Sequence, residues 1–98
     1  MKSATAVVRN KAGLHSRPAD LFVRTARLYE CAVTVAHSSN SEKEPADAKN
    51  IIRVILLNVA PGEEITITAD GPDEDAAVQD LVELVESDFS RVNESVRV

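Results

Sequence analysis

The sequence has little of several residue types, and each shortage excludes a class of protein. Its single cysteine, Cys31, cannot form a disulfide within the chain, which suits a reducing compartment. Tryptophan is missing, and only Phe22, Tyr29 and Phe89 could stack on nucleic-acid bases. The net charge of −5 also opposes nucleic-acid binding, because a phosphate backbone repels an acidic protein.

Long hydrophobic runs are missing as well. The longest aliphatic run, Val54–Leu57, is far shorter than the roughly 20 apolar residues that span a bilayer. The first apolar stretch, Ala4–Val8, stops at Arg9 and does not make a secretory signal. We therefore expect a cytoplasmic protein without membrane insertion. The length of 98 residues predicts one domain over 1–98, with 91–98 as a short C-terminal extension.

Apolar periodicity predicts an α+β fold. Residues 16–29 place Ala19, Phe22, Ala26 and Tyr29 on one helical stripe, whereas Glu64–Ala69 alternates as a strand does. We predict strands and helices over these ranges: strands Ala4–Arg9, Cys31–Ala36 and Glu64–Ala69, and helices Ser16–Tyr29, Asp47–Leu57 and Asp73–Asp88. The polar residues 38–45 form a turn with at most a short edge strand. Too few residues separate the strand Cys31–Ala36 from the next possible strand for a parallel crossover, so we expect this pair to be antiparallel. One antiparallel sheet with its helices on a single face is then the simplest fold.

The most informative stretch is residues 13–19, Gly-Leu-His-Ser-Arg-Pro-Ala. Gly13 allows a sharp turn with positive φ, where a side chain would clash. Pro18 is tolerated in the first turn of a helix, because its missing N–H would have no partner there. These two residues place His15 at or just before the N-cap of the helix.

This position predicts an anion site around His15. Backbone N–H groups at the start of a helix, including that of Ser16, are unpaired, and the helix dipole adds positive potential. The same potential disfavours imidazolium and leaves a neutral, nucleophilic ring. Arg17 supplies a bidentate donor for a phosphate bonded to that ring. The structural alternative is that His15 merely caps the helix and Arg17 is a solvated charge.

Residues 13–19 resemble the active-site signature of HPr, the histidine phosphocarrier family of the bacterial sugar phosphotransferase system. Residues 48–54 and 61–67 are similar to a second stretch of that family, and the element order matches over about residues 5–89. The resemblance implies an open-faced β-sandwich, a four-stranded antiparallel sheet with three helices on one face. It implies that Enzyme I, charged from phosphoenolpyruvate, phosphorylates Nδ1 of His15, which then passes the group to a sugar-specific IIA protein. It implies no cofactor and no metal, and a covalent carrier rather than a free-standing enzyme.

The resemblance also implies a partner surface. It consists of an apolar patch and two basic positions: Ile51, Ile52 and Ile55, with Arg24 and Arg27. Asp20 stands where the family usually has a small or neutral residue, and Arg53 where it has glycine, so both could alter which partner docks. On a helix Asp20 can reach Arg17 and Arg24, and we expect it to hold Arg17 away from unphosphorylated His15.

A second departure concerns regulation. Many members carry a serine at the start of the middle helix that a dedicated kinase phosphorylates, and Asn50 occupies this position here. An amide cannot accept phosphate, so we expect that form of control to be missing. Ser38, Ser39 and Ser41 lie in the preceding loop, which is a few residues longer than usual, and do not match the position.

Three other functions stay open at this point. The chain could be a regulatory module whose phosphorylated His15 reports metabolic state, the phosphocarrier of a dihydroxyacetone kinase relay, or a small ligand-binding module. His37 lies far from His15 in sequence and is expected to take no part in the chemistry. We expect a monomer.

Overall fold

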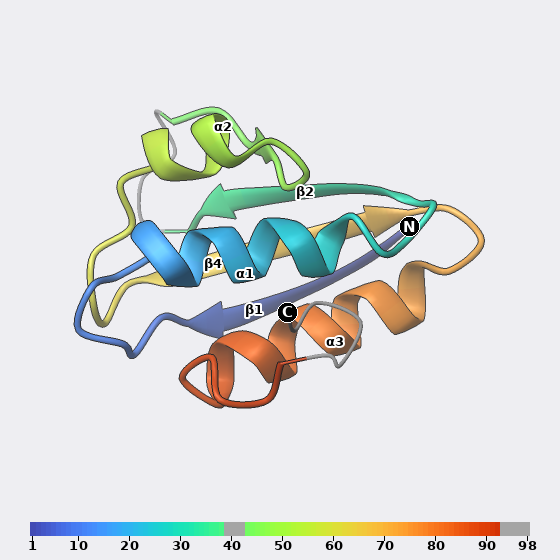
Figure 1. Ribbon diagram of the computed structural model, residues 1–98. Coiled ribbons are helices and arrows are strands. Elements are labelled where there is room, and N and C mark those ends of the chain that lie inside the picture. Colours follow the sequence, from blue (N-terminus) through green and yellow to red (C-terminus); the bar gives the residue numbers. More distant parts are fainter. Residues whose placement is uncertain (39–42, 93–98) are drawn as a thin grey trace.

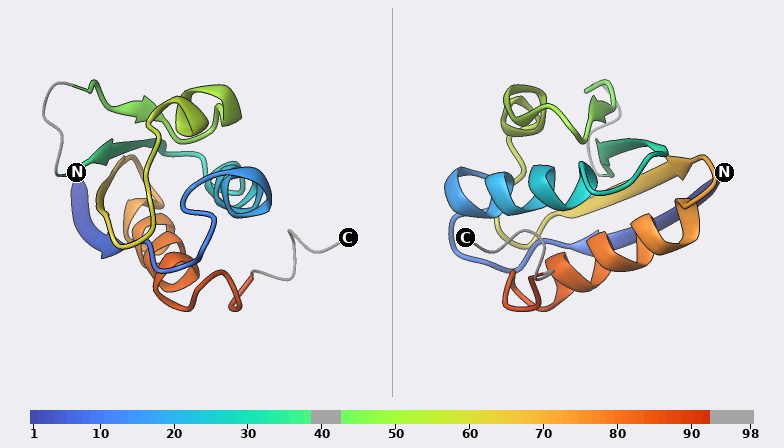
Figure 2. Two further views of the ribbon diagram at one scale, coloured as in Figure 1. Left: turned by 90° about the vertical axis from the view of Figure 1, so that its left-hand side faces the viewer. Right: turned by 45° about the vertical axis from the view of Figure 1, so that its right-hand side comes forward.

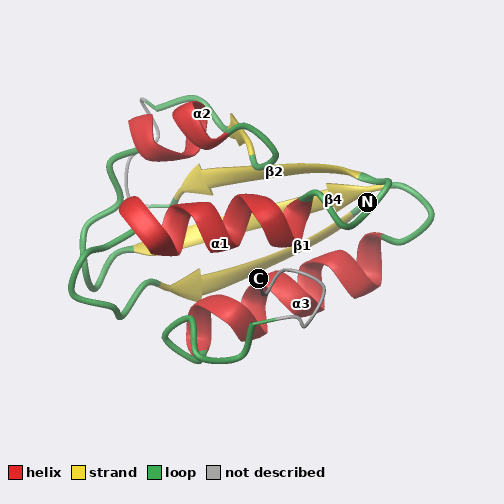
Figure 3. Cartoon of the chain, in the orientation of Figure 1, coloured by secondary structure: helices red, strands yellow, loops and turns green. Residues whose placement is uncertain are grey.

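The computed structural model describes residues 1–38 and 43–92. Within them one sheet holds four strands in the order β1-β4-β2-β3, and every neighbouring pair is antiparallel. Along the chain the elements are β1 (Lys2–Val7), α1 (Ser16–Ala26), β2 (Ala32–His37), β3 (Ala46–Asp47), α2 (Ile51–Leu56), β4 (Glu64–Asp70) and α3 (Glu74–Glu86). The helices all lie on one face of the sheet (Figure 1, Figure 3). The predicted open-faced α+β sandwich is confirmed.

Strand alternation decides which face of the sheet the helices cover. In β4 the side chains of Ile65 and Ile67 are fully buried, whereas Thr66 and Thr68, which alternate with them, are only half-buried. The register pairs Ile67 with Val35 of β2 on one side, so the apolar residues of neighbouring strands share a face. The helices pack on that apolar face and leave the other open, as the two turned views show (Figure 2).

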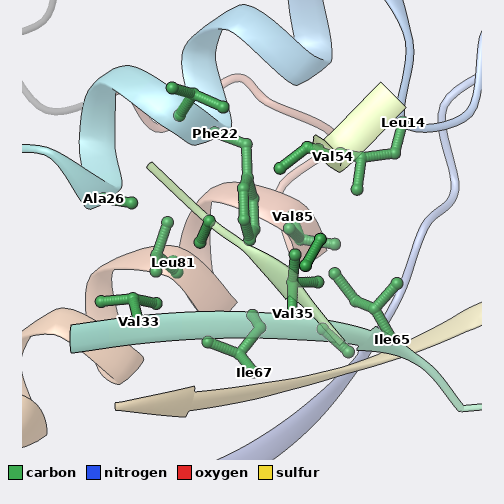
Figure 4. Packing of buried hydrophobic residues seen from close by; sticks show 14 of the residues in the cluster. Leu14, Phe22, Ala26, Val33, Val35, Val54, Ile65, Ile67, Leu81 and Val85 are labelled. Atoms are coloured by element: carbon green, nitrogen blue, oxygen red, sulfur yellow. The ribbon is translucent and has the colours of Figure 1, made fainter. Parts of the chain in front are cut away.

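The core between the sheet and the helices anchors the residues around His15. Phe22 of α1 points into the middle of the core, where Leu81 and Val85 of α3 meet the sheet (Figure 4). Leu14 belongs to the same cluster and is fully buried. The residue just before His15 is therefore fixed in the core.

Several strand boundaries differ from the prediction. β1 begins and ends two residues earlier than Ala4–Arg9, because its register follows β4 from Lys2 opposite Ala69 to Val7 opposite Glu64. β2 begins at Ala32, since the N–H of Cys31 donates to the Asp73 carboxylate instead of to a neighbouring strand. We predicted a short edge strand within residues 38–45, and the observed strand β3 lies just after this range. It pairs antiparallel with β2, as expected. Residues 39–42 of the long loop and 93–98 of the C-terminal extension lie outside the described residues.

The helices are shorter than predicted. α1 ends at Ala26 because the N–H groups that follow its C-cap residue bond carbonyls three residues back instead of four. The N–H of Leu28, for example, donates to the carbonyl of Thr25. The predicted helix Asp47–Leu57 instead holds the last residue of β3, a turn and then α2, because Asp47 pairs with β2 and its carboxylate accepts the N–H of Lys49. Asn58 ends this segment in the left-handed conformation, with φ of 52°. α3 buries Val78, Leu81 and Val85 in the core and stops at Glu86, two residues before its predicted end.

Candidate functional site

The loop before α1 is closed by a tight turn. Gly13 has φ of 68°, and its N–H donates to the carbonyl of Asn10 at 3.1 Å. The side-chain amide of Asn10 returns a hydrogen bond to the Gly13 carbonyl at 2.7 Å. A Cβ at position 13 would clash with the carbonyl oxygen of Val59, so only glycine fits here. The prediction of a positive φ at Gly13 is confirmed.

His15 is the N-cap residue of α1, as predicted. Its backbone is extended, with φ of −132° and ψ of 167°, and its carbonyl accepts the N–H of Ala19 at 3.4 Å. The imidazole makes no capping hydrogen bond and is half-buried. Because the side chain does not cap the helix, the ring nitrogens are available for other contacts.

Two backbone N–H groups directly after His15 are unpaired in the part of the chain that the structure describes. The N–H groups of Ser16 and Arg17 precede the first helical hydrogen bond and have no acceptor among the residues that the structure describes. Ser16 has φ of 50°, in the left-handed region that a residue with a side chain seldom adopts. Pro18 has no N–H to offer. The start of α1 therefore presents unpaired donors next to His15, and these are the groups that bind an oxyanion.

The charges on α1 are paired differently from our expectation. Oδ1 of Asp20 accepts a hydrogen bond from Nε of Arg24 at 3.1 Å. Arg17 is exposed and forms no ion pair within residues 1–38 and 43–92. The expectation that Asp20 holds Arg17 away from His15 is wrong, because Arg24 at i+4 satisfies the carboxylate. Arg17 is left uncommitted beside the anion site.

Arg27 has a structural partner. Its Nε donates to the carbonyl of Lys49 at 2.9 Å, and the ammonium of Lys49 donates in turn to the carbonyl of Tyr29 at 2.6 Å. These bonds tie the end of α1 to the turn that leads into α2. The remaining guanidinium nitrogens of Arg27 stay available, since the residue as a whole is exposed.

The middle helix exposes an apolar surface. Ile52 is 65% exposed, Ile55 36% and Leu56 63%, and we name these three residues the α2 patch. Ile51, which the resemblance placed in the same patch, packs partly against the core. Leu56 was not predicted to be part of this patch, although its i+4 spacing from Ile52 puts these two side chains on the same helical face. Among the residues described, α2 buries only Val54 along its length.

Asn50 caps α2. Its side-chain oxygen accepts the N–H groups of Ile52 at 3.1 Å and Arg53 at 3.3 Å. This explains an asparagine at the helix start without any further role. Of the three serines in the preceding loop, Ser38 shares a hydrogen bond with the Thr66 hydroxyl, and Ser39 and Ser41 lie outside the described residues.

The second histidine and the cysteine are both buried away from this site. His37 contacts Glu63, with 3.1 Å between Nε2 and Oε1. Cys31 is 2% exposed, and burial and the neighbouring Asp73 raise the pKa of its thiol to about 11, so it is an unreactive core residue. No group of three or more His, Cys, Asp or Glu side chains able to hold a metal ion occurs within residues 1–38 and 43–92.

Comparison with known proteins assigns the chain to a family. The model of the family described as the PTS HPr component phosphorylation site matches residues 2–87. The chain belongs to the HPr family, the phosphocarriers of the phosphotransferase system. It is 40% identical to the phosphocarrier protein HPr of Haemophilus influenzae over 74% of this chain and 81% of that protein. The corresponding values for HPr of Streptomyces coelicolor are 36% identity, 86% and 87%.

Solved HPr structures share the fold. HPr from Thermoanaerobacter tengcongensis superimposes with a TM-score of 0.83 at 36% identity, covering 95% of this chain and all of that one. The multiphosphoryl transfer protein of Salmonella typhimurium is 35% identical over 79% of this chain, which matches only 20% of that longer protein. Among the described residues of this HPr family member, the helices are all too short or too polar to cross a membrane.

Proposed function

We propose that this HPr family member carries the phosphoryl group on His15, receiving it from Enzyme I and passing it to a IIA protein. The observation that carries the proposal is the position of the ring. His15 is an N-cap residue whose imidazole caps nothing, and it lies beside the unpaired N–H groups of Ser16 and Arg17. A helix start with a free nucleophile and free donors is built to hold a covalently attached anion.

The chemistry needs little from the carrier itself. A neutral imidazole attacks phosphorus through Nδ1, the N–P bond forms, and the bond to the donor breaks. The positive potential at the helix start favours the phosphate once it is attached to the ring. The N–H groups and the uncommitted guanidinium of Arg17 bind the phosphate oxygens.

An open site suits a relay. A phosphohistidine must be stable enough to travel between partners but must not be held so tightly that transfer fails. His15 lies at a half-exposed helix start that offers a few hydrogen bonds, and the docked partner completes the water-excluding environment in which the group moves in line.

The docking surface follows from what α1 and α2 expose. The α2 patch supplies apolar area, and two exposed residues, Arg24 on α1 and Arg27 at its C-cap, supply positive charge. Partners with an apolar depression rimmed by carboxylates fit this combination. The proposal includes a monomeric, cytoplasmic carrier, because both exchange partners must reach the same surface in turn.

The test is transfer of label from phosphoenolpyruvate through purified Enzyme I. We expect one acid-labile phosphate per wild-type chain, mapped to His15, and none on the His15→Ala variant. Circular dichroism should show that the variant is folded, since the imidazole forms no hydrogen bond that the fold needs. Label that maps to His37, or that persists on His15→Ala, would contradict the assignment.

Arg17 gives a second test of the same site. Arg17→Ala should lower the rate of labelling by about 10- to 100-fold, the range expected when a charge-assisted hydrogen bond to a reacting phosphate is lost. Arg17→Lys should recover only part of this loss, because an ammonium cannot bind two oxygens in a planar fork. An unchanged rate in Arg17→Ala would show that the backbone N–H groups alone hold the phosphate.

A regulatory role is the second candidate. Two structures of the catabolite repression protein Crh of Bacillus subtilis match this chain, at 32% identity with a TM-score of 0.67 and at 33% with 0.61. The fold therefore does not separate sugar transport from regulation. Onward transfer does: label that passes from His15 to IIA proteins supports transport, and a phosphorylated carrier that no IIA protein discharges supports the regulatory role.

A further inference from the structure

One peptide group, between Val59 and Ala60, connects a buried polar pair to the backbone before His15. Its carbonyl oxygen, on Val59, accepts the N–H of Leu14 at 3.1 Å. Its N–H, on Ala60, donates to Oε1 of Glu63 at 2.7 Å. Because a peptide group is planar, the two hydrogen bonds hold the same rigid unit from opposite sides.

Glu63 is itself oriented from the core side. Nε2 of His37, whose side chain is 4% exposed, lies 3.1 Å from the same Oε1 atom. The N–H of Glu63 also donates to the Ala60 carbonyl at 3.1 Å, which closes the turn. The hydrogen bond from Ala60, and then the contact with His37, lower the pKa of Glu63. An ionised carboxylate makes the stronger hydrogen bond to the peptide N–H.

The peptide group is in close contact with the site loop. A Cβ on Gly13 would overlap the Val59 carbonyl oxygen, so the two backbones approach as closely as glycine allows. Leu14 follows, and its side chain is fully buried in the core. A displacement of the Val59 carbonyl would therefore move the backbone immediately before His15.

We propose that Glu63 is a positioning residue for phosphoryl transfer at His15. Oriented by His37, its carboxylate fixes the Val59–Ala60 peptide, and this peptide fixes the backbone of Leu14. Glu63 acts only through these backbone groups and makes no contact with the phosphate. This inference rests on the proposed function of His15, but the backbone contact can be tested without any transfer.

The first test measures the contact directly in the full-length protein. In Glu63→Ala the Leu14 amide should exchange with deuterium about tenfold faster, as expected when a supporting hydrogen bond is lost. The His15 ring resonances should shift in the same variant. Glu63→Gln retains an acceptor oxygen and should stay close to wild type, whereas Glu63→Asp, one methylene shorter, should resemble Glu63→Ala. The matched control is Glu64→Ala, which removes an adjacent carboxylate that forms no hydrogen bond or ion pair with the residues that the structure describes, and which lies opposite Val7 in the sheet.

The second test measures transfer from Enzyme I. The maximal rate of labelling should fall about tenfold in Glu63→Ala, recover in Glu63→Gln, and stay unchanged in the control. The KM for Enzyme I should hardly change, because the α2 patch is untouched. Leu14 exchange and His15 resonances like those of the control would overturn the inference, and so would altered resonances with an unchanged rate. Wild type that takes no label would contradict the proposed function instead, and the exchange comparison would still decide whether Glu63 positions this backbone.

Discussion

Asp20 and Arg24 form an ion pair on α1, the helix that begins directly after the residue that we propose to be phosphorylated, with 3.1 Å between Oδ1 and Nε. The pair is partly solvated, with 38% of the Asp20 side chain and 49% of the Arg24 side chain exposed. It leaves Arg17 free to bind phosphate and places a partly neutralised carboxylate near the site. We expect the pair to influence the site through its charge.

The first prediction follows from this pair. Asp20→Ala removes a negative charge near the phosphate and should stabilise phosphorylated His15 by no more than about 1 kcal/mol, the upper range for exposed charges. The equilibrium between phosphoenolpyruvate and phosphorylated carrier measures the effect, and it should shrink as salt rises. An equilibrium at low salt that is identical in wild type and variant would make Asp20 an ordinary surface residue.

The second prediction compares two glycines with positive φ. Gly13→Ala should lower the free energy of unfolding by roughly 1–2 kcal/mol from the left-handed backbone alone, and by more because its Cβ meets the Val59 carbonyl. Gly62→Ala is the matched control, because Gly62 has φ of 86° and nothing within 4 Å of an added Cβ. Urea unfolding of both variants separates backbone strain from the clash. Equal losses would show that the loop before His15 yields without cost.

Local chemistry explains which features the sequence could predict. Gly13 and Pro18 act on their own backbone, so the N-cap position of His15 was correctly predicted from residues 13–19. The two-residue strand β3 depends on pairing with Thr34 and Val35, and no local pattern marks it. Asp20 could reach two arginines on its helix, and only the three-dimensional arrangement shows that Arg24 takes it.

Contacts between segments that are distant in the sequence could not be predicted for the same reason. The hydrogen bond from Arg27 to the carbonyl of Lys49 joins two segments that are 22 residues apart, and the residues around neither of them predict it. The contact of His37 with Glu63 is of this kind too, and the sequence suggested only that His37 takes no part in the chemistry. Residues that support a site from a distant part of the chain become apparent only in the three-dimensional structure.

The third prediction concerns Asn50. Asn50→Ala should lower the free energy of unfolding by about 1 kcal/mol, because the N–H groups of Ile52 and Arg53 lose their acceptor, and Asn50→Ser should recover most of the loss.

The same position bears on regulation. The ATP-dependent kinase that acts on many HPr proteins should leave wild type unmodified at Asn50 and accept Asn50→Ser. Stoichiometric phosphoserine on wild type, at Ser38, Ser39 or Ser41, would show that the regulatory position has moved.

The last prediction concerns stability in acid and Asp73, whose carboxylate joins the start of α3 to the segment before β2. Its two oxygens accept the N–H groups of Glu30 at 2.8 Å and Cys31 at 2.9 Å. The Glu30 hydrogen bond is the main reason that the pKa of Asp73 is lowered from 3.8. A lowered pKa in the folded state means that the carboxylate stabilises the fold fully above pH 3.8, and that this contribution is lost as the pH falls through the folded value.

Asp73→Asn should therefore be less stable than wild type at pH 7, because an amide offers one acceptor where two N–H groups need one each. The difference between the two proteins should narrow as the pH falls below 4, since protonation costs wild type the same hydrogen bonds. Urea unfolding of both proteins from pH 7 to pH 2 measures this, with Asp75→Asn as the control. Asp75 lies on the first turn of α3, 83% exposed, and its only described ion pair is a 3.9 Å contact with Lys2. A constant difference between wild type and Asp73→Asn across the whole range would show that ionisation of Asp73 does not stabilise the fold.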